Sequence, residues 1–535
     1  MAIIVWLFML GEDGWSRLLL DGDTGWHIRT GEHILSGRGI PFTDLFSFSR
    51  AGEPWFAWEW GADVISALFH QAWGLKGIVL LGAAQVALFA VILFRYMIWR
   101  GSNTLIALAV GLLAMGGGSV HYLARPHLYT LILLPAAIWM IERDRLRPNA
   151  WTWLLVPISA LWTNLHGGFM ALLACLGLLV LGTAIETLWH GETGGWPAVR
   201  RYGMLTGLCS LATLVNPYGW RLHQHVLAYL RSDWIREAVE EFQSPRFRSE
   251  NLLHFEILLL AGLVACAGVL SRRGVTEVLW ILFWAHQSLA SVRHVTVYVT
   301  LAAPIIALEA SILWRRWAGD APRKSTRRIL DSLALDMHSG FRWTSLWPLV
   351  FLGVLAFGET GVRWPADFPR LRFPVDLVSR HADLLKSSRV ITTDQWADYL
   401  VYRFHPVVKV FFDGRSDFYG PKLGQEYVRM SGGGWDWRLL MERHDFDTAL
   451  VPVDWALASL LKQDPTWRLL TDDGKCLLFH KAGRVGGKNP RTGLMKSIPP
   501  SETSMRELID MKTGIVAGHP VVPPVPGSMS LGSME

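Results

Sequence analysis

The chain has 535 residues, of which 51% are hydrophobic and only 18% are charged. Soluble domains carry about 25% charged residues, so the long apolar runs with short polar breaks predict a protein with many membrane spans. The formal net charge of +6 is small for this length, and the basic residues gather in particular loops. This distribution argues against nucleic-acid binding and indicates a fixed orientation in a membrane.

The four cysteines predict neither a disulfide framework nor a metal site. Cys175, Cys209 and Cys266 fall within apolar runs, and Cys476 stands alone in a polar region. The first apolar stretch, residues 2–10, is shorter than the about 20 residues that a spanning helix needs. We therefore expect the first span to continue irregularly to residue 20 or residues to be missing before it.

Ten further apolar runs follow, and with the first they predict about eleven membrane spans. They cover residues 76–99, 103–120, 127–142, 150–164, 168–189, 202–216, 254–271, 275–290, 294–314 and 343–358. Positively charged loops stay in the cytoplasm, and the basic clusters around 95–100, 143–147, 200–201, 272–273 and 315–328 occupy alternate loops. The other loops and everything after residue 358 are then predicted to face outward.

The outward-facing segments hold a series of polar residues beside apolar runs, and we expect no matching collection at the opposite end. The series is Asp21, Asp23, Glu59, His121, Arg125, His127, Asn164, His166, Asn216, Glu241, Arg293 and His294. Such residues are costly unless they face a protein or aqueous interior, which predicts one shared polar site. An alternating-access transporter would hold them near the middle of the membrane instead.

The outer loop 11–75 and the region after residue 358 are both predicted to be folded. Residues 26–35 and 55–73 have the helical, tryptophan-rich pattern of interfacial helices. After residue 358 the pattern predicts a small α/β domain, with strands at 389–393, 407–412, 448–453, 467–470 and 475–480 and helices at 396–403, 422–430, 436–444 and 454–463. The predicted division is a transmembrane domain at 1–360, the α/β domain at 361–485 and a disordered tail at 486–535, rich in Pro, Gly and Ser.

The Asp21-Gly-Asp23 motif has three interpretations. Aspartate is common at helix starts, so the pair could cap the helix that follows. Two carboxylates at this spacing could hold a divalent cation, Mg²⁺ or Mn²⁺, that also meets a phosphate. One of them could instead act as general base for an incoming hydroxyl group. The motif alone leaves all three open.

Two motifs, Arg125-Pro-His127 and Arg293-His294, each place a cation beside a histidine at the outer rim. The forked donors of arginine suit a phosphate or pyrophosphate. An arginine at this depth can also simply extend toward lipid headgroups.

Further candidates share the same side of the membrane. Glu59 lies between two tryptophans, a setting typical of sugar binding and equally of an interfacial aromatic belt. His166, followed by two glycines, is either a packing or capping residue or a catalytic one. The residues predicted to line the substrate are Trp26, His27, Asn164 and Asn216.

In this order, these residues resemble the GT-C superfamily of integral membrane glycosyltransferases, in particular the group of protein O-mannosyltransferases and lipid A aminoarabinose transferases. Asp21-Gly-Asp23 occupies the place of the family's acidic motif in the first outer loop. Trp26-His27, Trp58-Glu59-Trp60 and Arg125-Pro-His127 fit bacterial members, and the likeness covers about residues 1–360. Many members have adjacent acidic residues, whereas a glycine separates them here, which bears on metal dependence and on the choice of base.

The resemblance implies a GT-C-like enzyme that passes a sugar, with inversion, from a polyprenyl-phosphate-linked donor to a hydroxyl group. The acceptor is a polysaccharide, lipid or protein at the outer face of the inner (plasma) membrane, and the α/β domain is periplasmic. The implied catalytic residues are Asp21, Asp23 and Glu59, and the implied donor-phosphate ligands are Arg125, His127, His166, Arg293 and His294. Two alternatives remain: a flippase or exporter of lipid-linked glycan, and a non-catalytic envelope assembly factor.

Overall fold

The structure is a computed structural model that describes residues 14–191, 195–248, 252–322, 324–340, 353–354, 357–358 and 364–482. The predicted first span at 2–10, most of the run at 343–358 and the predicted tail at 486–535 lie outside these residues. The chain divides into two compact units, residues 1–427 and residues 428–529. The predicted boundary at residue 360 falls inside the first unit.

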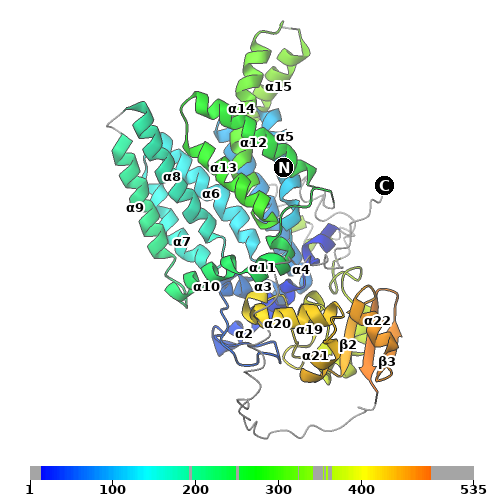
Figure 1. Cartoon of the computed structure of the whole chain (residues 1–535). Helices are drawn as coiled ribbons and strands as arrows, with labels where there is room; N and C mark the ends of the chain where they lie inside the picture. Colours follow the sequence, from blue (N-terminus) through cyan, green and yellow to red (C-terminus); the bar gives the residue numbers. More distant parts are fainter. Residues whose placement is uncertain are drawn as a thin grey trace, which may run out of the picture. The chain divides into compact units, whose positions relative to one another are not determined.

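The apolar runs of the first unit form helices that pack side by side (Figure 1). They are α4 (Leu75–Trp99), α5 (Thr104–Gly118), α6 (His127–Leu146), α7 (Leu155–Thr163), α8 (Phe169–His190), α9 (Trp196–Ala212), α12 (Leu253–Ser271), α13 (Thr276–Ala290) and α14 (Val295–Gly319). Helix α14 packs against α4, α5, α6, α12 and α13, so it lies at the centre of the bundle.

Five segments of the described chain are long and apolar enough to cross a membrane. They are Leu75–Trp99, Thr104–His121, Phe169–His190, Leu253–Ser271 and Val292–Gly319. The total of about eleven spans stays a prediction.

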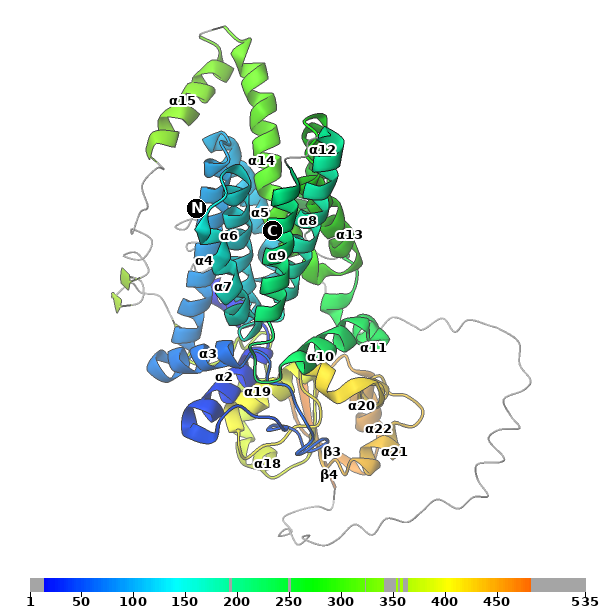
Figure 2. The same cartoon turned by 90° about the vertical axis from the view of Figure 1, so that its left-hand side faces the viewer.

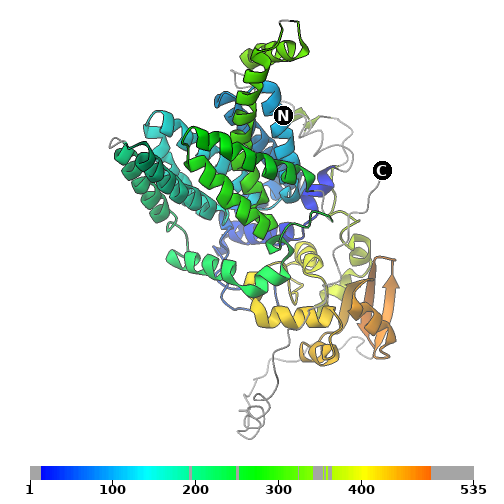
Figure 3. The same cartoon turned by 45° about the horizontal axis from the view of Figure 1, so that its top comes forward.

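Shorter helices lie at the two ends of the bundle (Figure 2). At one end are α2 (Asp23–His33), α3 (Trp60–Trp73), α10 (Trp220–Arg231), α11 (Asp233–Ala238) and α19 (Asp394–Phe404). At the other end α15 (Thr326–Gly340) follows α14 and contacts both α14 and α5; Figures 2 and 3 show it at this end of the bundle. The two helices predicted within the outer loop are therefore present, as α2 and α3. Short turns of other helix types are η1 (Gly14–Leu19), η2 (Ile34–Arg38), η3 (Ser119–His121), η4 (Ala150–Leu154), η6 (Glu240–Phe242) and η7 (Val292–His294).

Helix α2 packs between α3 and α19, although α19 comes from the region after residue 360. A Cβ atom on Gly25 would lie 2.7 Å from the carbonyl oxygen of Asp398, so only glycine permits this approach of the two helices. The outer loop and the segment around α19 consequently belong to one body, which is why the predicted boundary does not separate them.

The part of the first unit after residue 363 contains both helices and a short strand. It contains α17 (Val375–Arg380), α18 (Ala382–Lys386), β1 (Val390–Ile391), α19 and the start of α20 (Ser416–Ser431). The prediction of a strand at 407–412 is wrong. Val410 makes a single parallel bridge with Ser47, bonding to Phe46 and Phe48 of the outer loop, and the pairing goes no further.

The second unit contains α21 (Trp437–Arg443), β2 (Thr448–Pro452), α22 (Ala456–Gln463), β3 (Trp467–Asp472) and β4 (Cys476–Lys481). Strand β4 pairs antiparallel with both β2 and β3, and its residues 476–479 are buried. The predicted β3–β4 hairpin is confirmed. The side chains of Asp472 and Asp473 accept the N–H groups of the turn that follows them.

Candidate functional site

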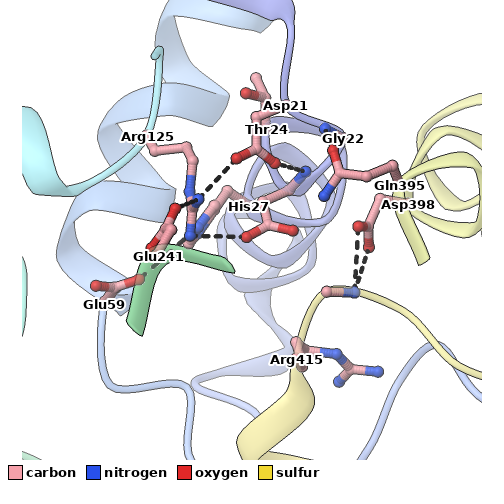
Figure 4. Close-up of polar contacts among 12 residues, drawn as sticks. Asp21, Gly22, Thr24, His27, Glu59, Arg125, Glu241, Gln395, Asp398 and Arg415 are labelled. Carbon is pink, nitrogen blue, oxygen red and sulfur yellow. Dashed lines mark hydrogen bonds and ion pairs between the residues drawn. The ribbon is translucent and has the colours of Figure 1, made fainter. Parts of the chain in front are cut away.

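Arg125 joins three carboxylates at the α2 end of the bundle (Figure 4). Its Nη1 donates to Asp21 Oδ2 at 2.7 Å and to Glu241 Oε1 at 2.8 Å, and its Nη2 lies 2.8 Å from Asp23 Oδ2. Charge-assisted bonds of this length are strong and fix the geometry of all four groups. These carboxylates hold the pKa of Arg125 well above its usual range, although burial lowers it. Arg125 therefore serves first as the counter-ion of the acidic motif.

Asp21 and Asp23 have different surroundings although they are two residues apart. Asp21 Oδ1 accepts the backbone N–H of Asp23 at 2.9 Å, which satisfies one orphan donor in the first turn of α2. The capping interpretation is therefore correct for one atom, Asp21 Oδ1. Asp23 is 5% exposed, and besides its ion pair with Arg125 it shares a side-chain hydrogen bond with Asp398. Burial raises the pKa of Asp23 to about 7, against the lowering effect of Arg125.

The metal interpretation of the motif fails a test of fit. The oxygens that would face a shared cation, Asp21 Oδ2 and Asp23 Oδ2, both bind the Arg125 guanidinium. Among the described residues, no group of three or more His, Cys, Asp or Glu side chains could hold a metal ion. As placed, these residues do not fit a resident metal between the two aspartates.

Glu59 lies between two imidazoles. Its Oε2 is 3.7 Å from His27 Nε2 and its Oε1 is 3.6 Å from His166 Nε2. Behind His27, the Nδ1 atom lies 2.6 Å from Asp63 Oδ1, a contact that the sequence did not predict. Burial raises the pKa of Glu59 to about 7 and that of Asp63 above its usual range, and it lowers the pKa of both histidines. Near neutral pH Glu59 can therefore gain or lose a proton, whereas the two histidines stay neutral.

The proton of His166 is placed by its neighbours. The backbone N–H of Gly168 donates to His166 Nδ1 at 2.9 Å, and the Thr130 hydroxyl lies 2.8 Å from the same atom. Because Nδ1 accepts, the ring proton of the neutral imidazole sits on Nε2, which faces Glu59. His166 is therefore oriented toward the site rather than buried as packing alone.

Arg293, predicted to bind phosphate, is held by aromatic groups. Its Nη1 donates to the Tyr229 hydroxyl at 3.1 Å, and its guanidinium lies 5.0 Å from the centroid of the Phe242 ring. Within the described chain it forms no ion pair with a carboxylate within 4.0 Å, unlike Arg125. Its charge is thus less fully compensated than that of Arg125.

The other predicted site residues lie less directly in this cluster. His127 Nε2 is 2.5 Å from the His121 carbonyl oxygen, and the Trp26 ring centroid is 3.6 Å from that of His27. Asn164 Oδ1 accepts from the Trp60 indole at 2.7 Å, which fixes the end of the Glu59 loop. No contact among the described residues joins Asn216 or His294 to the carboxylates around Arg125. Asn216 bonds to the backbone of its own loop, and His294 Nδ1 lies 3.2 Å from the Gln287 carbonyl.

Helix α19 and the loop after it supply groups that the sequence analysis missed. Asp398 is fully buried and accepts the Gly414 N–H at 3.2 Å, beside Asp23 (Figure 4). The Gly22 N–H of the acidic motif donates to Gln395 Oε1 at 2.7 Å. Burial, together with Asp23, holds the pKa of Asp398 well above its usual range. The available signal was the spacing of Gln395 and Asp398, two polar residues one helical turn apart in α19.

No family model matches the sequence, and no curated protein matches it. Among solved structures, the apo oligosaccharyltransferase of Archaeoglobus fulgidus is similar with a TM-score of 0.53 and 11% identity, over 85% of this chain and 69% of that one. The archaeal oligosaccharyltransferase AglB from the same organism, in complex with an inhibitory peptide and a dolichol-phosphate, gives 0.54 and 10%, over 91% and 74%. The chain therefore has a fold similar to that of these oligosaccharyltransferases.

ArnT from Cupriavidus metallidurans, bound to undecaprenyl phosphate, matches with 13% identity over 91% of this chain and 98% of that one, at a TM-score of 0.47. The two similar oligosaccharyltransferase structures agree with the predicted fold, and the five long apolar segments agree with a multi-pass membrane protein. At 10–11% identity they establish the fold alone.

The opposite end of the helix bundle also carries charged groups, so the expectation of a single polar end is wrong. Buried ion pairs there join Arg100 to Glu142 at 3.0 Å and Arg145 to Glu277 at 2.8 Å. Arg201 and Asp144 form another pair at 2.7 Å. Each of these carboxylates has an arginine of its own, whereas Asp21, Asp23 and Glu241 share Arg125.

The buried Asp413–Arg415 pair provides a prediction for the segment that follows α19. Arg415 donates to Asp413 at 2.9 and 2.7 Å, and Asp44 lies 2.8 Å from Arg415 Nη2. Removing one partner of a buried pair costs about 3–5 kcal/mol, so Asp413→Asn is expected to lower the melting temperature clearly. Binding of polyprenyl phosphate to the folded variant should not change. A lost affinity at a temperature where the variant is folded would place the phosphate site at this pair.

Proposed function

We propose that the chain is a glycosyltransferase that moves a sugar from a polyprenyl-phosphate-linked donor to a hydroxyl acceptor. The observation that carries this proposal is Asp23, a buried carboxyl at the α2 end of the helix bundle whose pKa burial raises to about 7 although Arg125 binds it. An ionised carboxylate in this position can accept a proton from a hydroxyl group. The similar AglB structure, which contains a dolichol-phosphate, supports a lipid phosphate as the leaving group.

In the proposed reaction the acceptor hydroxyl gives its proton to Asp23. Its oxygen then forms the new bond to the anomeric carbon while the bond from that carbon to the phosphate oxygen breaks. The electron pair leaves with the lipid phosphate, whose charge needs cationic stabilisation. A single displacement of this kind inverts the anomeric centre.

We assign the departing phosphate to Arg293 rather than to Arg125. Arg125 is already neutralised by three carboxylates, whereas the Arg293 guanidinium is held by Tyr229 and Phe242. Burial lowers the pKa of His166, and Arg293 lies close enough for its charge to lower this pKa further; we assign the His166 Nε2–H to a second phosphate oxygen. Glu59, whose pKa burial raises to about 7, is a second carboxyl of this site that changes its charge near neutral pH.

The proposal includes an orientation. The basic loops at the α15 end face the cytoplasm, so the α2 end faces outward from the inner membrane and the region after residue 361 is periplasmic. The acceptor, a polysaccharide, lipid or protein, then arrives from the outer aqueous side.

The test uses the full chain in proteoliposomes with radiolabelled polyprenyl-phosphate sugars, beginning with the mannose donor. A glycosyltransferase releases polyprenyl phosphate in proportion to the labelled acceptor formed. A flippase would move the donor between leaflets and leave the sugar–phosphate bond intact. Translocation without release, across a panel of sugars and acceptors, would overturn the proposal.

A further inference from the structure

A groove runs along α14 at the end of the bundle away from Arg125. It has a volume of about 370 Å³ and is lined by Ile106 of α5 and by Ala310, Leu313, Trp314 and Trp317 of α14. The lining is almost entirely apolar, and Leu313 and Trp317 are 61% and 54% exposed. On a spanning helix such a surface faces hydrocarbon rather than water. The groove is therefore suited to an acyl chain.

Basic groups lie at the end of this groove. The Arg327 guanidinium of α15 lies 4.2 Å from the centroid of the Trp317 ring, a cation–π contact. The Trp314 indole N–H donates to Asp331 Oδ1 at 3.1 Å, which ties α15 to the same tryptophan pair. Residues 315–336 contain six basic and three acidic side chains, so this end is positively charged. Tryptophans that bond polar groups in this way mark the depth of the headgroups.

Helix α15 has the amphipathic form of a helix that lies in the membrane interface. The Thr104 hydroxyl donates to the Ala334 carbonyl at 3.0 Å and anchors the helix to α5. Ile329 and Leu333, four residues apart on one face, remain 57% and 46% exposed. Apolar side chains on one face and arginines on another are the pattern that binds anionic lipid surfaces.

We propose that this groove and α15 form a binding site for one acidic phospholipid. An acyl chain lies along Leu313 and Trp317, and the headgroup phosphate meets Arg327 and Arg328. The positive charge of this end favours an acidic headgroup over a zwitterionic one. The site is separate from the Arg125 cluster and does not depend on the proposed function.

The test measures lipid retained by the delipidated full chain after addition of phosphatidylglycerol or of phosphatidylcholine with the same acyl chains, by native mass spectrometry. Each arginine near a headgroup contributes about fivefold in affinity. The Arg327→Gln/Arg328→Gln variant should therefore bind phosphatidylglycerol about 30-fold more weakly. Ala310→Phe, which fills the groove and leaves the charges, should also displace the lipid. The control is Arg468→Gln/Lys475→Gln, an equal change of charge at exposed positions in the second unit, which should have no effect.

Two outcomes would overturn the proposal. One is that the native chain retains phosphatidylglycerol and phosphatidylcholine equally, or that the Arg327→Gln/Arg328→Gln variant retains as much phosphatidylglycerol as the native chain. The other is full displacement of the lipid by millimolar inorganic phosphate, which would show that the site recognises a free anion and not a lipid. Melting temperatures of all variants, measured in the same detergent, separate lost binding from lost folding.

Discussion

Replacing Asp23 by Asn is expected to reduce glycosyl transfer by about 10²–10⁴-fold, the contribution of a well-placed general base. Asparagine keeps the shape of the side chain and can still accept from Arg125, so the α2 end should keep its structure. Donor binding should stay near the native level, because the phosphate is assigned to Arg293 and not to Asp23. The measurement pairs initial transfer rates with the affinity for polyprenyl phosphate.

The pH dependence of the native protein follows from the same assignment. Burial raises the pKa of Asp23 to about 7, and the base must be ionised to accept a proton. We therefore expect kcat/KM to rise with pH up to about 7 and then to level off, and Asp23→Asn should remove this rise from the residual activity. Glu59, whose pKa is also raised to about 7, lies in the same site. The pH profile of Glu59→Gln must therefore be compared with that of Asp23→Asn to decide which carboxyl causes the rise.

Asp21→Asn separates the base from the metal interpretation. If the two aspartates held a cation together, this variant would be as inactive as Asp23→Asn, and chelators would inhibit the native chain. Since Arg125 occupies the space between them, we expect a smaller loss and no effect of chelators. Native rates of transfer in both variants would remove the case for an acidic base and favour the flippase.

The helices of this chain were predictable because their signals are periodic and local. The apolar runs and the patterns at 26–35 and 55–73 predicted α4 to α9, α12 to α14, α2 and α3 close to their observed bounds, but not α10 and α11. The strand at 407–412 was predicted from an apolar run alone. It fails because pairing depends on residues 46–48, more than 350 positions earlier in the chain.

The candidate site was only partly predictable for a related reason. Sidedness placed Asp21, Asp23 and Arg125 on the same face of the membrane, and the structure joins them by direct contacts. The predicted membrane side could not show that Asp398 and Gly414 lie near α2, because both residues fall in a region that was predicted to be a separate domain. The close approach of α2 and α19 at Gly25 joins residues that are far apart in the sequence, so no short-range sequence pattern predicts it.

Gly414 tests how tightly the segment after α19 controls Asp23. A Cβ atom at this position would lie 1.9 Å from Asp23 Oδ1 and 3.0 Å from Asp398 Oδ2. Neither carboxylate can give way easily, since Asp23 is held by Arg125 and Asp398 by the Gly414 N–H. The methyl group of Gly414→Ala must therefore displace the carboxyl that we assign as the base.

A misplacement of about 1 Å can cost about 100-fold in rate, so we expect Gly414→Ala to lower kcat by about that factor. Donor affinity should change little, because Arg293 and His166 do not contact this loop in the described structure. The matched control is Gly207→Ala in α9, where a Cβ would meet nothing within 4 Å and where alanine favours the helix. Both variants should be compared by kcat, donor affinity and melting temperature. A native kcat in folded Gly414→Ala would mean that the position of Asp23 beside this loop does not limit the reaction, and the base would then have to be sought at Glu59.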